Sequence, residues 1–69
     1  MNYAKLRGKI REVFGTNRKF AKAMQMDYSV LSAKLNRKSQ WKEEEIKKAC
    51  SLLGIPIEEV HLYFFSFGS

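Results

Sequence analysis

The sequence is poor in the residues that build reactive or metal-stabilised sites. Its 69 residues include one cysteine, one histidine and one proline. A single cysteine excludes an intramolecular disulfide, and the ligand count excludes a four-ligand zinc site. No Ser/His/Asp or Cys/His set, glycine-rich phosphate loop or metal-ligand spacing is present. We therefore expect no enzyme activity, no metal and no cofactor, with Cys50 as a buried small hydrophobe and His61 at the surface.

Long apolar runs are lacking as well. No stretch approaches the roughly 20 residues of a membrane span, and the Met-Asn-Tyr-Ala start does not have the features of a signal peptide. We expect a cytoplasmic protein without a membrane partner or small-molecule substrate.

Acidic residues are scarce in one part of the chain, although 29% of all residues are charged. Residues 1–42 hold eleven Lys or Arg against Glu12 and Asp27, a net charge of +9, whereas residues 43–69 have a net charge of −3. This asymmetry favours one face that meets a polyanion. A solvated, lysine-rich surface that only improves solubility is the alternative.

The apolar residues recur at helical spacing throughout, and no segment alternates long enough to form a strand. Gly15 and Gly54 are suited to end helices, and Thr16 and Asp27 to begin them. Pro56 can open the last helix, with Ile57, Val60 and Phe64 turned inward. The predicted helices span 3–14, the segment after Thr16, the segment after Asp27, about 41–53, and the segment from Pro56. We predict an all-α fold, a compact five-helix orthogonal bundle that forms a single domain over residues 1–69.

Residues 16–36 have the spacing of a helix-turn-helix. Ala21 is small where the two helices must touch, and Asp27 can start the second helix sharply. Large apolar residues are available to fill the wedge between the helices: Phe20, Met24, Met26, Leu31 and Leu35. Several requirements met together make this pattern more specific than any one of its residues.

On these residues the chain resembles the short, single-domain phage repressor and Cro type of helix-turn-helix, the lambda-repressor-like DNA-binding domain. The resemblance rests on Phe-Ala-Lys-Ala at 20–23, Leu-Ser-Ala-Lys-Leu-Asn at 31–36, Glu-Ile at 45–46, Leu-Leu-Gly-Ile-Pro at 52–56 and Tyr-Phe-Phe at 63–65. It implies a five-helix domain, sequence-specific operator binding and dimers on paired half-sites, in the cytoplasm of a bacterial host cell or encoded by a prophage. The chain is too short for the second, self-cleaving domain of larger phage repressors. Two positions depart from the family: Gln25 stands where glycine is frequent in the turn, and Asn36-Arg37 replaces a frequent Asn-Gly.

The second helix of this unit would enter the major groove of double-stranded DNA with its N-terminal residues leading. We assign base-edge contacts to Tyr28, Ser29, Ser32 and Ala33. Phosphate contacts are assigned to Asn17, Arg18, Lys19, Lys34, Asn36, Arg37, Lys38 and Lys42. Each cation could instead be only solvated, Ser32 could bond to its own helix, and Tyr28 could pack on the domain.

The C-terminal tail, residues 62–69, is unusually aromatic. Tyr63, Phe64 and Phe65 are expected to fold back over the first and fourth helices, and the remaining apolar surface at Leu62 and Phe67 is a candidate homodimer contact. Three functions stay open. The first is a phage-type transcriptional repressor, the second a protein-binding helix-turn-helix that sequesters a partner in the manner of an antirepressor, and the third an RNA-binding or architectural DNA protein.

Overall fold

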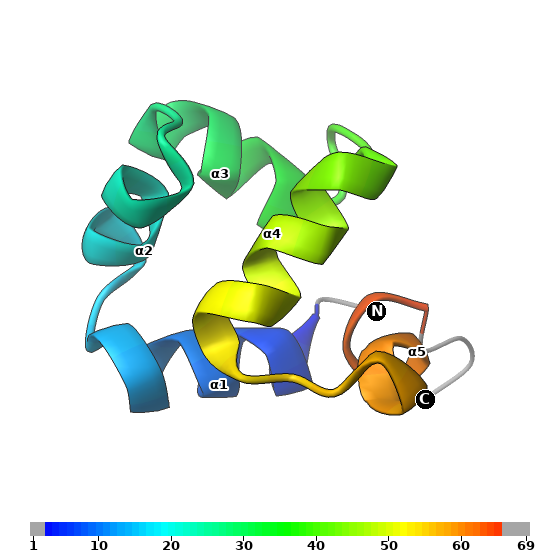
Figure 1. The fold of residues 1–69 in the computed structure, drawn as a ribbon. Coiled ribbons are helices and arrows are strands. Elements are labelled where there is room, and N and C mark those ends of the chain that lie inside the picture. Colours follow the sequence, from blue (N-terminus) through cyan, green and yellow to red (C-terminus); the bar gives the residue numbers. More distant parts are fainter. Residues whose placement is uncertain (1–2, 66–69) are drawn as a thin grey trace.

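The computed structural model describes residues 3–65, and helices are the only regular structure in that range. The α-helices are α1 (Ala4–Phe14), α2 (Asn17–Met24), α3 (Tyr28–Leu35), α4 (Glu43–Leu53) and α5 (Val60–Phe64), with a 3-10 turn η1 (Ile57–Glu59) directly before α5. In Figure 1, α4 crosses the middle of the bundle, α1 runs beneath it, and α2 and α3 lie together on the opposite side from α5. The prediction of an all-α, five-helix bundle is confirmed.

The helix ends follow the local chemistry of the sequence. Gly15 ends α1 with φ of 88°, and Gly54 ends α4 with φ of 69°; both lie in the region of positive φ that favours glycine. Thr16 precedes α2, and its Oγ1 accepts a hydrogen bond from the backbone N–H of Lys19 at 3.1 Å. Asp27 precedes α3 as predicted, but its side chain makes no capping hydrogen bond.

Helix α4 begins two residues later than the sequence predicted. The backbone N–H of Lys42 donates to Oε1 of Glu45 at 2.8 Å, which places Lys42 at the N-cap and Glu45 in the first turn. Trp41 consequently lies outside the helix, and its ring packs edge-on against Phe64 with centroids 5.1 Å apart. The early acidic residues Glu43, Glu44 and Glu45 occupy the first turn, where the helix dipole favours them.

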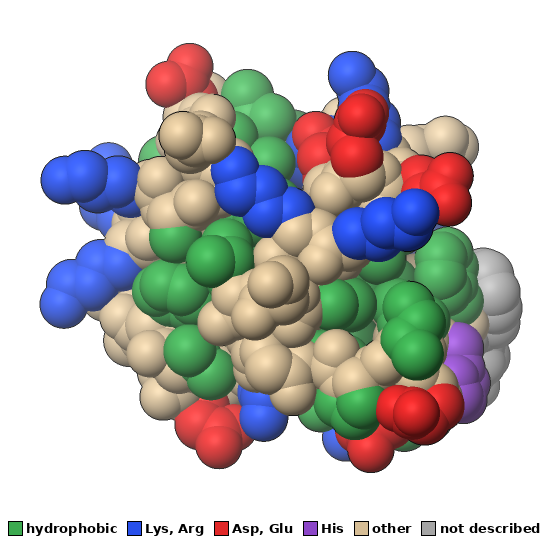
Figure 2. All heavy atoms as spheres, viewed as in Figure 1, with side chains coloured by type: hydrophobic (Ala, Val, Ile, Leu, Met, Phe, Trp, Pro, Cys, Tyr) green, Lys and Arg blue, Asp and Glu red, His purple; other side chains and the backbone are tan. Residues whose placement is uncertain are grey.

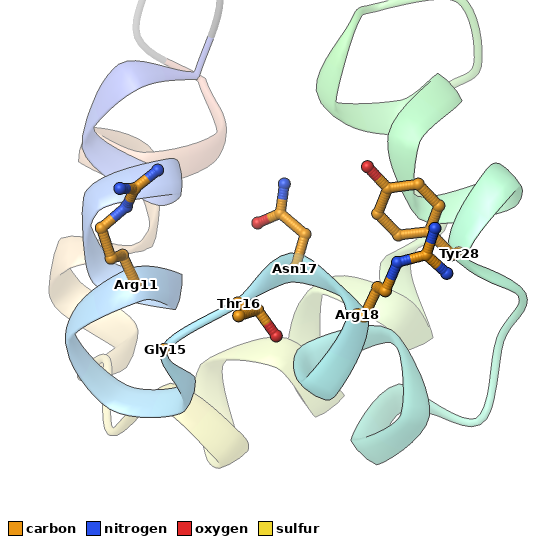
Figure 3. A pocket seen from close by; sticks show the side chains of 6 residues that line it. All are labelled: Arg11, Gly15, Thr16, Asn17, Arg18 and Tyr28. Atoms are coloured by element: carbon orange, nitrogen blue, oxygen red, sulfur yellow. The ribbon is translucent and has the colours of Figure 1, made fainter.

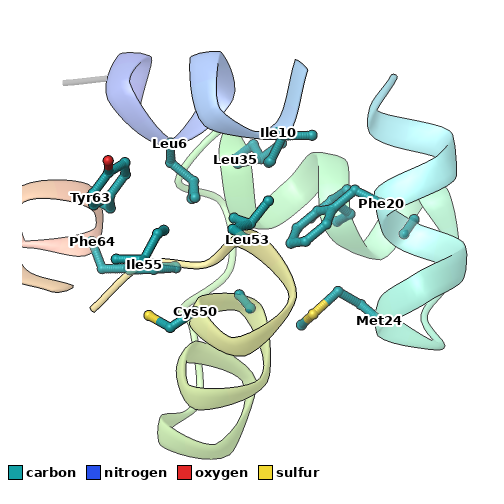
Figure 4. Packing of buried hydrophobic residues seen from close by; sticks show 13 residues of the cluster. Leu6, Ile10, Phe20, Met24, Leu35, Cys50, Leu53, Ile55, Tyr63 and Phe64 are labelled. Carbon is teal, nitrogen blue, oxygen red and sulfur yellow. The ribbon is translucent and has the colours of Figure 1, made fainter. Parts of the chain in front are cut away.

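The core lies where α1, α2, α3 and α4 converge, and Figure 4 shows its side chains pointing toward one another. The largest fully buried side chains are Phe20, Leu6, Ile10, Leu31 and Leu35. Burial of each such side chain contributes about 1.5–3 kcal/mol. Met24, Ala49 and Leu53 complete this region, and the buried Cys50 is a small hydrophobe as expected.

The C-terminal part closes the core differently from the prediction. Tyr63 and Phe64 are buried, as expected, whereas Phe65 is 48% exposed. Ile57, which we expected to face inward, is 70% exposed, and Ile55 is buried in its place. The expectation for Ile57 was wrong because Pro56 is followed by the 3-10 turn η1 rather than by a continuous α-helix. A 3-10 turn has three residues per turn instead of 3.6, so the side of the turn on which Ile57 lies differs from the side predicted for an α-helix.

Candidate nucleic-acid interface

Helices α2 and α3 are joined by a tight turn centred on Gln25. Gln25 has φ of 63° and ψ of 40°, a left-handed conformation, and Met26 N–H donates to the carbonyl of Ala21 at 3.0 Å. Lys48 on α4 holds this turn, since its Nζ donates to Oε1 of Gln25 at 2.8 Å and to the carbonyl of Met24 at 3.3 Å. The turn is therefore fixed to the rest of the bundle without the glycine that is frequent at this position.

The outward face of α3 is uncharged. Tyr28 and Val30 are each 41% exposed, and Ser29 is exposed between them. Ser32 and Ala33 are half-buried on the same helix. Four of these residues were predicted to read bases. Val30 was missed, and helical spacing gave no signal for it, because its neighbour on the same face at i+4 is the buried Lys34.

Lys34 is not available for a phosphate, and that prediction was wrong. It is 4% exposed, its Nζ lies 2.9 Å from Oε1 of Glu45, and it donates to the carbonyl of Gln40 at 2.9 Å. Its Nζ also lies 5.9 Å from the centre of the Trp41 ring. These contacts join α3 to the start of α4 and use the ammonium group within the fold.

The contact with Lys34 also affects the pKa of Glu45. Burial raises the pKa of its carboxyl, but the hydrogen bond from Lys42 N–H and the hydrogen bond and charge of Lys34 outweigh burial, so the pKa is lowered overall. Glu45 therefore serves two neighbours, the N-terminus of its own helix and the ammonium of Lys34.

A cationic hollow opens where α2 begins. It has a volume of about 380 Å³ and is lined by Arg11, Gly15, Thr16, Asn17, Arg18 and Tyr28. Figure 3 shows Arg11 on one side, Arg18 and Tyr28 on the other, and Asn17 between them. The guanidinium of Arg18 lies 4.3 Å from the centre of the Tyr28 ring. Two guanidinium groups and the unpaired N–H groups of a helix N-terminus suit a phosphate.

Arg11 was not among the predicted phosphate contacts. It lies on the exposed last turn of α1, and only the fold brings it opposite Arg18. Lys19, which was predicted, is exposed on the first turn of α2. The exposed Arg11, Arg18 and Lys19 thus place positive charge at one end of the α3 face.

The loop after α3 places positive charge at the other end of the outward face of α3. Arg37, Lys38 and Lys42 are exposed, as their predicted role requires. Arg37 has φ of 63°, and its guanidinium lies 5.3 Å from the centre of the Tyr3 ring. Asn36 is exposed too, but its side-chain oxygen accepts a hydrogen bond from Arg7 at 2.9 Å, so much of its amide is already engaged.

Five of the seven acidic residues lie in α4 and η1, away from this interface, whereas the exposed Asp27 directly precedes α3 and the exposed Glu12 follows Arg11. Figure 2 shows Lys and Arg projecting from the side of α2, whereas most red acidic groups lie near the start of α4 and around η1, with single red groups at the upper left and lower left. Leu62, one of the two predicted dimer residues, is 41% exposed. Phe67, the other, lies outside the described residues.

No alternative chemical site emerges from residues 3–65. In this range no group of three His, Cys, Asp or Glu side chains could hold a metal ion, and burial raises the pKa of the Cys50 thiol, which disfavours a nucleophilic thiolate. The helices described here are all too short or too polar to cross a membrane.

The fold and surface define a small, all-helical domain with an uncharged helix face between two cationic ends. The chain belongs to the family described as "Protein of unknown function (DUF739)", whose match covers residues 1–67. A solved structure, the solution structure of the modulator of repression (MOR) of the temperate bacteriophage TP901-1 from Lactococcus lactis, is similar over 94% of this chain and 88% of that chain, with 42% sequence identity and a TM-score of 0.85. No curated protein matches the chain.

Proposed function

We propose that the protein is a phage-type transcriptional regulator that binds duplex DNA through α2 and α3, a helix-turn-helix of the repressor and Cro type. The observation that carries the proposal is the charge arrangement around α3. Cations of α1 and α2 lie at one end of its outward face, and Arg37, Lys38 and Lys42 lie beyond the other. A helix in the major groove has phosphates at both of its ends, so this arrangement matches the ligand.

Affinity and base discrimination would come from different residues. Because Lys34 is used within the fold, the phosphate contacts are assigned to the exposed cations and to one amide: Arg11, Arg18, Lys19, Arg37, Lys38, Lys42 and Asn17. The base contacts fall to Tyr28, Ser29, Ser32 and Ala33, with the Val30 methyl groups available to a thymine methyl. Because none of these offers an arginine fork or a terminal amide, discrimination per base is expected to be near 1 kcal/mol.

The salt dependence of duplex binding tests the proposal. If about five cations contact phosphates, log affinity should fall with log salt concentration at a slope of about −4.5. Replacing Arg18 or Arg37 by glutamine should reduce the slope by about 0.9. Lys47→Gln is the matched control, since Lys47 is 69% exposed on α4 and pairs with Glu43. A slope near zero would refute the proposal.

Selection of bound sequences from a random duplex pool would then define the operator. Enrichment of a pseudo-palindrome that weakens in Tyr28→Ala and Ser32→Ala supports sequence-specific reading by α3 and a homodimer on two half-sites. Salt-dependent binding without enrichment would instead indicate an architectural role.

A second function has its own support. The outward face of α3 carries the half-exposed apolar residues Tyr28 and Val30 and no charged side chain, which also suits contact with a protein. The similar phage protein is titled a modulator of repression. A regulator that sequesters a partner, such as a repressor, would bind that partner with little dependence on salt and would show only weak duplex binding.

A further inference from the structure

Arg7 of α1 links the first helix to the end of α3. Its Nη2 donates to the backbone carbonyl of Leu35 and to Oδ1 of Asn36, both at 2.9 Å. These residues are separated by 28 and 29 positions in the chain, so the contact exists only in the folded bundle. A fixed guanidinium at the C-terminus of a helix also complements the helix dipole.

The contact with Arg7 determines how the Asn36 amide is oriented. A guanidinium has N–H donors and no acceptor, so the atom of Asn36 that faces it must be the oxygen. The amide nitrogen is thereby turned toward α3, where Nδ2 donates to Oγ of Ser32 at 3.3 Å. Arg7, Asn36 and Ser32 form a directed chain of hydrogen bonds, from α1 to the outward side of α3.

The end of this chain biases Ser32 toward donation. Its hydroxyl oxygen accepts from Asn36 through one of its two lone pairs, and within residues 3–65 its hydroxyl hydrogen has no acceptor. The hydrogen is therefore available to an outside acceptor, whereas half of the acceptor capacity of the oxygen is already used. In the major groove, guanine offers N7 and O6, adenine N7 and thymine O4 as acceptors, whereas the edge of cytosine offers the N4 donor.

We propose that Ser32 reads its base as a hydrogen-bond donor, and that Arg7 and Asn36 are positioning residues that set this polarity. The inference rests on the proposed binding of duplex DNA and adds a specificity to it. At the base pair that faces Ser32, guanine is preferred and cytosine on the contacted strand is disfavoured by about fivefold, the value expected for one hydrogen bond.

Asn36→Asp tests this assignment by reversing the chain. The new carboxylate accepts from Arg7 through one oxygen and from the Ser32 hydroxyl through the other, so Ser32 turns its lone pairs outward. The base preference at this single position should then move from guanine toward cytosine. Affinity for all sequences should fall by a common factor, because a negative charge is added near the phosphates.

Binding is measured against four duplexes that differ only at this base pair, for the full chain, Asn36→Asp, Ser32→Ala and the double variant. Ser32→Ala should remove the preference in both backgrounds, and Arg7→Met should weaken it without reversal because the amide is then free to turn. Circular dichroism confirms that each variant is folded. A purely structural role for Asn36 would change affinity but not the preferred base.

The outcomes separate the two proposals. Unchanged rejection of cytosine in folded Asn36→Asp, or a preference that survives Ser32→Ala, overturns the assignment of Ser32 and leaves DNA binding standing. Absence of salt-dependent duplex binding by the parent chain overturns the proposed function and the base contact together. A reversal that disappears in the double variant supports the directed chain.

Discussion

The buried lysine of α3 gives a sharp test of how this surface is built. Lys34→Met keeps the aliphatic stem beside Trp41 but removes the ammonium that contacts Glu45 and the Gln40 carbonyl. We expect the variant to be less stable and to bind DNA with an unchanged salt slope. A lysine that contacts phosphate would give the opposite pattern, a reduced slope with unaltered stability.

The size of the effect follows from the surroundings of the two charges. Hydrogen bonds to a charged group contribute about 1.5–3 kcal/mol each. Part of this is offset, because a buried ammonium no longer has to be desolvated and the Glu45 side chain, 20% exposed, can regain water. A net loss of about 2 kcal/mol is expected, which corresponds to a decrease in Tm of about 8–16 °C in a domain of this size.

Urea denaturation followed by circular dichroism measures the free energy of unfolding, and duplex titration at several salt concentrations measures the slope. The double variant Lys34→Met/Glu45→Gln completes a cycle in which the loss should be smaller than the sum of the single losses. Stability within 0.5 kcal/mol of the parent, together with a slope reduced by about 0.9, would refute the assignment of Lys34 to the fold.

Two further predictions concern the same framework. The pKa of Glu45 is lowered in the folded state, so the stabilisation that its carboxylate provides is present above the ordinary glutamate pKa of about 4.3 and is lost as pH falls through the folded value. The free energy of unfolding should therefore decline more steeply from pH 5 to pH 3 in the parent than in Glu45→Gln. Equal declines in the two proteins would contradict this. Gln25→Gly relieves about 1–2 kcal/mol of left-handed strain but removes a hydrogen bond from the Lys48 ammonium, which contributes about 1.5–3 kcal/mol. The free energy of unfolding should therefore fall by about 0.5–1 kcal/mol; thermal melts that show a gain would mean that the strain outweighs the bond to Lys48.

The helices could be predicted because their signals are local. Gly15 and Gly54 end helices through backbone freedom, and Thr16 begins one through a hydrogen bond only three residues away. The apolar spacing predicted the core residues of α2 and α3 for the same reason: Phe20, Met24, Leu31 and Leu35. Where two local signals competed, as after Pro56, the prediction failed, since a proline can open either an α-helix or a 3-10 turn.

The candidate site was less predictable because its residues depend on distant partners. Lys34 follows Leu31 by three residues, so helical spacing places it on the inward side of α3. The prediction followed the residue type instead and assigned this lysine to a phosphate. Its partner Glu45 lies on the next helix, so the ion pair could not be inferred from helical spacing alone. Arg11 and Arg7 gave no signal at all, because only the packing of α1 brings one to the start of α2 and the other to the end of α3.

The resulting surface separates two tasks that many DNA-binding helices combine. Positive charge lies at the two ends of α3, where under the proposed function it would bind any duplex, while the face between them carries hydroxyls, a phenol ring and methyl groups. On such a face, a few directed hydrogen bonds must supply the discrimination, and a hydroxyl with one lone pair already occupied discriminates more than one that is free to turn. The contact from Arg7 through Asn36 to Ser32 supplies that constraint from outside α3, so base preference should respond to substitutions in α1 that never approach DNA.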